Sequence, residues 1–156
     1  MTSGNSTTRT IVERHLAQVS RGMTGDLADA YAENAIVEQP FVSHGKGRIE
    51  GREALRAHFA WATSVPLQLR VDNLVVYETT DPEIVIAEYD YDARVVPTGA
   101  TFRLPNVQVF QVRGGEIVCS RDYHDHAAIA AALNAAREDA NANEPVQFFT
   151  PNRSSR

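Results

Sequence analysis

The segment IVIAEYDYDARVV, at residues 84–96, decides the fold class. Successive side chains of an extended chain point to opposite faces, and here apolar or aromatic residues alternate with mostly charged ones. One face carries Val85, Ala87, Tyr89, Tyr91, Ala93 and Val95, and the other carries Glu88, Asp90, Asp92 and Arg94. A strand with one buried and one wet face is typical of an antiparallel sheet.

Further strands flank this segment on both sides. Residues 67–72 alternate in the same way before it, and a turn at 97–99 (PTG) leads to a returning strand at 101–112. A hairpin turn at 113–116 (RGGE) then precedes a last strand at 117–124. The sequence therefore predicts four long strands in succession.

The chain before these strands has the 3.6-residue period of helices. Thr10 and Glu13 have the spacing of a capping box, which predicts a helix start at this point. The inner stripe of this first helix is Val12, His15, Leu16 and Val19. Asp26 is suited to cap a second, short helix that runs through Leu27, Ala30 and Tyr31.

A third helix is predicted from about Arg52, and it must end before Pro66. A short apolar run at 35–39 and a loop at 43–51 precede it, and its inner stripe is Leu55, His58, Phe59 and Ala62. Asp125 is suited to cap a final Ala-rich helix at about 126–138. Helices and antiparallel strands segregated along the chain indicate an α+β fold.

Composition is that of one ordinary folded domain. The chain has 156 residues, of which 43% are hydrophobic, and we expect a single domain at 9–138 with flexible tails at 1–8 and 139–156. The net charge is −5 without a basic stripe, which argues against a nucleic-acid partner.

Nothing in the sequence indicates export or a membrane partner. Cys119 is the single cysteine, so an internal disulfide is impossible. No apolar run approaches the roughly 20 residues of a membrane span, and the polar N-terminus lacks the apolar region of a signal peptide. We therefore predict a cytoplasmic protein.

Polar residues on inward faces are the candidates for chemistry, because their burial costs free energy unless they are paired. In the last strand Ser120, Asp122 and His124 share a face with Val118, while Ile117, Cys119, Arg121 and Tyr123 share the other. The pattern leaves open which face is the inner one. It also leaves open whether His58 and His15 are functional or are hydrogen-bonded core histidines.

A metal site is an alternative for the segment 122–126. Asp122, His124 and His126 would share one face of a continuing strand. A helix cap at Asp125 would end that strand, so we expect no metal. The sequence has no nucleophile elbow, glycine-rich phosphate loop or cysteine cluster, and we expect no cofactor.

Several strings in this order resemble the nuclear transport factor 2-like superfamily, which includes SnoaL-type polyketide cyclases, ketosteroid isomerases and limonene epoxide hydrolases. They are GDL at 25–27, GREAL at 51–55 and GEI at 115–117, and the resemblance covers about residues 9–135. It implies a cone-shaped, curled antiparallel sheet that wraps around helices and contains one internal pocket. It also implies a homodimer through the outer sheet face, although the charges on that face point to a polar interface.

The strongest resemblance is to the phenazine-biosynthesis PhzA/PhzB branch. The third helix has that branch's Arg-Glu-x-Leu-x-x-His-x-x-Trp pattern, from Arg52 to His58 and Trp61, and the last strand has Arg121-Asp122-Tyr123. This likeness implies that His58 and Asp122 line the same cavity.

Other branches are matched less completely. Gln39 stands before Pro40, where ketosteroid isomerases carry their base, and Gln108 stands at about the position of their oxyanion acid. Tyr89 and Tyr91 stand where limonene epoxide hydrolases carry an Arg-x-Asp partner.

The resemblance implies a cofactor-independent enzyme of secondary metabolism, in which Asp122 and His58 perform acid/base chemistry. The reaction would be isomerisation, cyclisation or condensation of a small apolar carbonyl or polyketide-like compound. We predict that the substrate is bound by Tyr89, Tyr91, Trp61, Gln39, Gln108, His15 and His124. A ligand-binding or accessory protein, and an epoxide hydrolase or epoxide-opening cyclase, are the alternatives.

Overall fold

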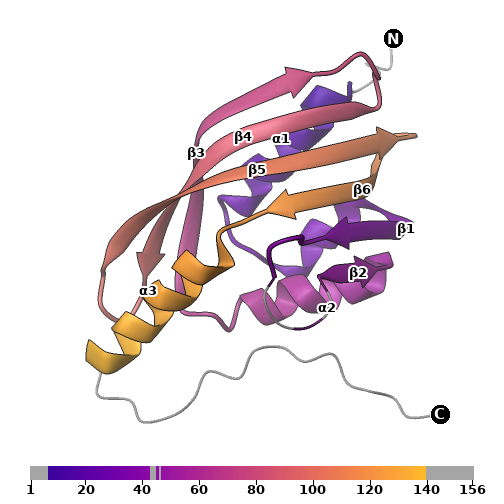
Figure 1. Ribbon diagram of the computed structural model, residues 1–156. Coiled ribbons are helices and arrows are strands. Elements are labelled where there is room, and N and C mark those ends of the chain that lie inside the picture. The colour runs from indigo at the N-terminus through magenta and orange to yellow at the C-terminus, as the bar shows by residue number, and fades with distance from the viewer. Residues whose placement is uncertain (1–6, 43–44, 46, 140–156) are drawn as a thin grey trace, which may run out of the picture.

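One six-stranded sheet, in the order β2-β1-β6-β5-β4-β3, forms the frame of the molecule (Figure 1). The computed structural model describes residues 7–42, 45 and 47–139. All neighbouring strands are antiparallel except β1 and β6, which are parallel. The elements are α1 (Thr8–Val19), the 3-10 helix η1 (Gly25–Ala30), β1 (Tyr31–Glu38), β2 (Arg48–Glu50), α2 (Arg52–Ala62), β3 (Leu67–Glu78), β4 (Ile84–Val95), β5 (Thr101–Arg113), β6 (Glu116–Tyr123) and α3 (His126–Asp139).

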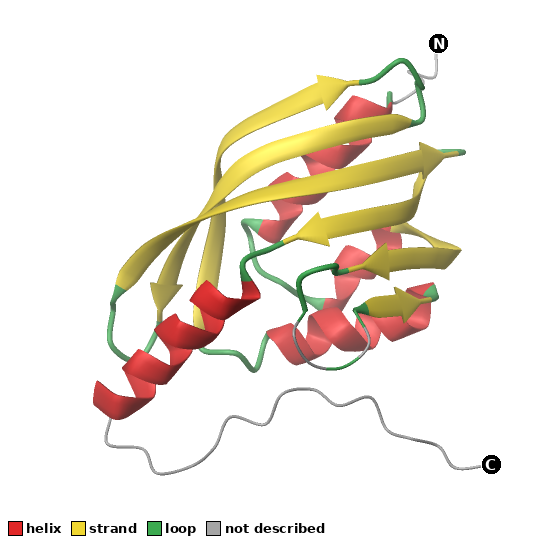
Figure 2. Ribbon diagram, viewed as in Figure 1, coloured by secondary structure: helices red, strands yellow, loops and turns green. Residues whose placement is uncertain are grey.

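The helices lie on the concave side of the curled sheet, as Figure 2 shows. Helix α1 packs against β3, β4 and β5, α2 packs against η1 and β1, and α3 crosses near β4. This arrangement confirms the predicted α+β class and the predicted sheet wrapped around helices. None of the helices in the described ranges is long and apolar enough to cross a membrane.

Irregularities in strand pairing accompany the curvature of the sheet. The register between β3 and β4 shifts between Asp72 and Val75, and Asn73 within this step has φ 53°. Asparagine tolerates this left-handed conformation better than most residues, and a bulge bends and twists the strand that contains it. A second shift separates Gln111 from Val112 in the pairing of β5 with β6.

Strand β4 confirms the prediction made from its alternation. Every odd-numbered residue from Val85 to Val95 is buried, whereas the even-numbered residues between them are half-buried or exposed. Because β4 is paired on both sides, its buried face forms the middle of the concave wall.

The structure corrects three boundaries. Helix α1 begins at Thr8 rather than at Thr10, because the hydroxyl of Thr7 accepts the Thr10 backbone N–H and caps the helix. The second helix is a 3-10 helix that ends at Ala30, and Tyr31 opens β1 instead. The segment predicted as a loop at 43–51 contains β2, which pairs with β1. Most of the predicted tails, at 1–6 and 140–156, lies outside the described residues.

Helix α2 is fixed at its start and along its inner face. The Arg52 guanidinium donates 2.7 Å hydrogen bonds to the Tyr31 carbonyl and to the Glu116 carboxylate, which joins the helix to β1 and β6. Leu55 is fully buried and Phe59 nearly so. These contacts hold the turn of α2 that carries His58.

We expect Leu55→Ala to reduce the free energy of unfolding by about 2–5 kcal/mol, because it removes a buried side chain and leaves a cavity. Urea unfolding followed by circular dichroism measures the loss. Leu67→Ala is the control, since Leu67 is only half-buried at the start of β3 and should cost less. Equal losses for the two variants would contradict the assignment of Leu55 to the core.

Candidate active site

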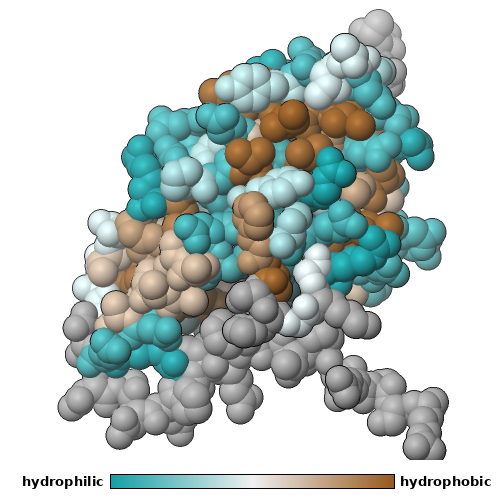
Figure 3. Space-filling model, viewed as in Figure 1, coloured by the Kyte–Doolittle hydropathy of each residue, from teal (hydrophilic) through white to brown (hydrophobic). Residues whose placement is uncertain are grey.

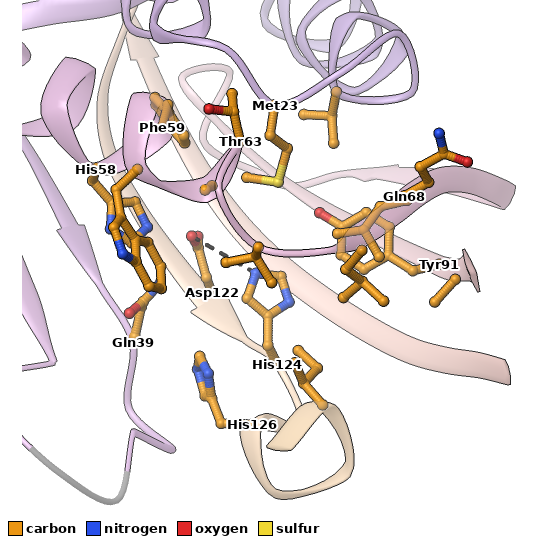
Figure 4. A pocket seen from close by; sticks show the side chains of 18 of the residues that line it. Met23, Gln39, His58, Phe59, Thr63, Gln68, Tyr91, Asp122, His124 and His126 are labelled. Atoms are coloured by element: carbon orange, nitrogen blue, oxygen red, sulfur yellow. Dashed lines mark ion pairs between the residues drawn. The ribbon is translucent and has the colours of Figure 1, made fainter. Parts of the chain in front are cut away.

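A cavity of about 1990 Å³ lies between the concave face of the sheet and helices α2 and α3. Figure 4 shows side chains from both sides of it, including His58, Asp122 and Tyr91. The cavity exceeds the roughly 300–1,000 Å³ of most small-molecule sites. It also reaches the surface, because the exposed residues Ser64, Pro66 and Gln68 contribute to its lining. The predicted pocket is therefore present, but it is open at one side.

Strand β6 turns its Ser120 and Asp122 side chains toward the inside. Both are buried, whereas Arg121 between them is exposed on the opposite face. Ile117 is buried as well, three residues before Ser120, because the register shift beside Cys119 interrupts the alternation. This bulge resolves which side of the strand is the inner one.

Asp122 lies at the centre of the polar part of the cavity. Ser120 Oγ donates a 2.8 Å hydrogen bond to Asp122 Oδ1, and Gln108, its cross-strand neighbour, donates to the same carboxyl group. Burial raises the pKa of Asp122, and the hydrogen bonds from Gln108 and Ser120 oppose that rise. The carboxyl group is therefore oriented by donors yet easier to protonate than an exposed aspartic acid.

His58 reaches the same cavity from helix α2. Burial lowers its pKa, while the negative charge of Asp122 acts in the opposite direction. Its ring centroid lies 5.8 Å from that of Phe59 and 6.1 Å from that of Trp61, which also lines the cavity. The structure thus brings together His58 and Asp122, the two residues predicted to be catalytic.

Two tyrosines of β4 lie beside this group. The Tyr89 hydroxyl donates to Gln108 Oε1 at 2.5 Å and lies 3.2 Å from the Tyr91 hydroxyl. Burial raises the pKa of Tyr91 to about 12 and that of Tyr89 well above its usual value, so both phenols stay protonated. Tyr91 and Gln108 line the cavity, but Tyr89 does not, because it lies behind them as a hydrogen-bond partner.

The remaining predicted binding residues occupy different parts of the cavity. Gln39 lies near His58 in Figure 4. His15 contributes to the lining from α1, but its Nε2 lies 3.3 Å from the Tyr31 hydroxyl, and burial lowers its pKa to about 4. His124 follows β6 and places its Nε2 3.9 Å from Asp122 Oδ2.

Sequence reasoning missed Asn106, which is buried and lies 2.8 Å from His124 through its Oδ1 atom. The signal was available, because Leu104, Asn106, Gln108 and Phe110 are alternate residues of one strand and all are buried. An asparagine on that face requires partners inside the fold.

The metal alternative does not match the structure of the segment 122–126. Strand β6 ends at Tyr123, and Asp125 Oδ1 accepts the Ala128 N–H at 2.9 Å, which caps α3. Within the described residues no group of three His, Cys, Asp or Glu side chains is arranged to hold a metal ion.

These groups together suit proton transfer. A carboxyl group with a raised pKa, neutral imidazoles and a protonated phenol face one cavity whose other walls are largely apolar. Titratable groups with opposite pKa shifts are the usual means of acid/base catalysis at neutral pH.

Comparisons with known proteins agree with this fold. The model of the SnoaL-like domain matches residues 12–120. The uncharacterized protein YesE of Bacillus subtilis is 30% identical over 112 residues, which cover 69% of this chain and 74% of that protein. The uncharacterized PhzA/B-like protein PA3332 of Pseudomonas aeruginosa is 28% identical over 114 residues, 72% of this chain and 80% of that protein.

A solved structure adds a third comparison. A Bacillus subtilis protein described as a candidate isomerase superposes with a TM-score of 0.73 and 26% identity. The match covers 81% of this chain and 92% of that one.

We expect Asp122→Asn to lower the pKa of His58, because the carboxylate that favours the charged imidazole is removed. The pKa of His15 should stay near 4, since its shift is caused by burial alone. NMR titration of the histidine ring protons measures both values. A His58 pKa that is unchanged in Asp122→Asn would show that the two groups do not interact.

Proposed function

Because the chain belongs to the SnoaL-like domain family, we propose that it is a cofactor-independent enzyme that moves a proton next to a carbonyl group of a small apolar substrate. The observation that supports the proposal most is the buried Asp122 carboxyl group, with its raised pKa, in a cavity that it shares with Tyr91 and His58. The description of a related structure as a candidate isomerase is consistent with this reaction class.

The proposed reaction begins when Asp122 removes a proton from the carbon beside the carbonyl group. The electron pair of the broken C–H bond moves to the carbonyl oxygen, which becomes an enolate. The protonated Tyr91 hydroxyl lines the cavity and would donate a hydrogen bond to that oxygen. Asp122 then returns this proton to another carbon, directly or through His58. Alternatively, the enolate attacks a second carbonyl group within the substrate, and the alkoxide that forms takes the proton back from Asp122.

The surroundings of Asp122 favour catalysis over ligand binding alone. A carboxylate paired with Arg121 or with a backbone amide would stay ionised and would mainly orient a ligand. Arg121, however, lies on the other face of β6. Asp122 is held by neutral donors, Ser120 and Gln108, which orient it without an opposite charge. Its Oδ2 atom lies 3.9 Å from His124 Nε2.

We expect the protein to catalyse exchange of α-protons of apolar cyclic ketones in deuterium oxide, followed by proton NMR. Asp122→Asn should slow the exchange about 10²–10⁴-fold, the range for a general base. Tyr91→Phe should slow it by about 10-fold or more, because the enolate loses a donor.

The matched control is Tyr77→Phe, which removes a hydroxyl group from the outer face of β3 and should leave the rate unchanged. Exchange that is insensitive to Asp122→Asn would refute the proposed base. Turnover of apolar epoxides without exchange of ketones would replace this reaction with epoxide opening, and tight ligand binding without either reaction would favour a binding protein.

We further propose a cytoplasmic homodimer of secondary metabolism that is joined through the outer sheet face. Register places Tyr77, Ile86 and Val109 in one row across β3, β4 and β5, and exposed Val75 and Val107 lie in the next row. Figure 3 shows hydrophobic side chains over this part of the sheet. Glu88 lies between Val75 and Val107, so a second copy that buried these apolar side chains would also have to pair this carboxylate.

Light scattering should therefore give twice the 17.2 kDa of one chain for the wild type. Tyr77→Lys should shift the mass toward one chain, because it places a charge in the apolar row. Thr101→Lys, at the opposite end of β5, is the control and should stay dimeric. A monomeric wild type would refute this interface.

A further inference from the structure

The neighbours of His124 determine which of its ring nitrogens carries the hydrogen. The Leu104 carbonyl can only accept, so the Asn106 atom that lies 2.8 Å from it must be the amide nitrogen. The amide oxygen of Asn106 then faces His124 Nδ1 at 2.8 Å. Since an amide oxygen has no proton to give, His124 Nδ1 carries the hydrogen of this bond.

This assignment leaves the other ring nitrogen of His124 as an acceptor. Burial lowers the pKa of His124 to about 4, so the ring is neutral at neutral pH and Nε2 has a free lone pair. The Nε2 atom lies 3.9 Å from Asp122 Oδ2. A carboxylate oxygen and a lone pair repel each other, whereas a protonated Oδ2 would donate to Nε2 and close the distance to about 2.7–3.0 Å.

The two oxygens of the Asp122 carboxyl group have different neighbours. Oδ1 accepts from Ser120, and the Gln108 oxygen accepts from Tyr89, which leaves the Gln108 NH₂ group for the carboxyl. Oδ2 is the oxygen that faces His124, so a proton placed on it would have the Nε2 acceptor beside it.

We propose that His124 is the proton partner of Asp122, held by Asn106 in the form protonated at Nδ1, so that Nε2 accepts the hydrogen of the Asp122 carboxylic acid. Its role in turnover rests on the proposed function. The proton taken from the substrate carbon bonds to Oδ2, is held there by Nε2, and returns from Oδ2 to the substrate. His124 and Asn106 are thus positioning residues.

The Asn106 amide determines where the proton stays. In serine proteases a carboxylate accepts from the histidine Nδ1–H and stabilises the charged imidazolium. Here a neutral amide takes that place, so the ring stays a weak base and the proton belongs to the carboxyl group. The other titratable groups near His124 are Tyr91 of β4, at 5.9 Å between ring centroids, and His126 of α3, at 6.0 Å. His58 of α2 acts on Asp122.

Long-range proton–nitrogen NMR of the wild type at neutral pH tests the assignment directly. We expect a protonated Nδ1 and an unprotonated Nε2 for His124. A ring protonated at Nε2 would overturn the proposal, and this measurement needs no variant that has to fold.

Asn106→Asp tests the consequence, because it replaces the amide by a carboxylate of the same size. The pKa of His124 should rise by about 1–3 pH units, and that of Asp122 should fall, since the charged imidazole would then favour the carboxylate. Asn134→Asp, an exposed position on α3, adds the same charge elsewhere and should change neither value. An unchanged His124 pKa in Asn106→Asp would overturn the proposal.

Ketone exchange separates this proposal from the proposed function. If the wild type catalyses exchange, the rise of its rate with pH should begin at lower pH in Asn106→Asp, and an unmoved profile would refute the role of His124 in turnover. If the wild type catalyses no exchange, the proposed function fails, while the NMR result still decides whether His124 and Asp122 form this pair.

Discussion

The burial of one carboxyl group, that of Asp122, is the constraint on which the rest of the site depends. Taking a carboxylate from water into an apolar interior costs free energy unless it is neutralised or hydrogen-bonded. The fold meets this constraint with neutral donors, Ser120 and Gln108, from the same and the adjacent strand. Because neither donor carries a charge, burial remains the dominant influence and the pKa of Asp122 stays raised.

The donors are in turn fixed by the pairing of the sheet. Register places Gln108 opposite Asp122 and Tyr89 opposite Asn106, so the polar side chains of β4, β5 and β6 lie side by side on the concave wall. Tyr89 donates to Gln108 and Ser120 donates to Asp122, while Asn106 bonds the Leu104 carbonyl and His124. A network in which the donors and acceptors are matched holds its members in one arrangement more firmly than single pairs do.

Much of the fold was predictable from the sequence because β4 alternates without interruption. The strand order along the chain, the third helix and the Asp125 cap followed from periodicity and capping residues, which act locally. The helix with His58 and the strand with Asp122 resemble those of the PhzA/PhzB branch. That resemblance predicted that the two side chains line one cavity, and both contribute to its lining.

Other features depend on contacts between distant segments and were not predictable in this way. The inner face of β6 is set by a bulge beside Cys119, which strict alternation does not reveal. Strand β2 has only three residues and exists through its pairing with β1. Asn106 was missed although its strand was predicted, because its role depends on a hydrogen bond with His124. That histidine follows the end of the neighbouring strand β6.

The hydrogen-bonded wall of the cavity and much of its aliphatic wall come from different elements. Strands β4, β5 and β6 supply the hydrogen-bonded groups, whereas α3 contributes small or aliphatic side chains such as Ala130 and Leu133. A substitution on α3 alters the shape of the cavity without breaking a hydrogen bond of the strands. Substitutions on α3 can therefore change which apolar ligands fit the cavity while the hydrogen-bonded groups around Asp122 stay as they are.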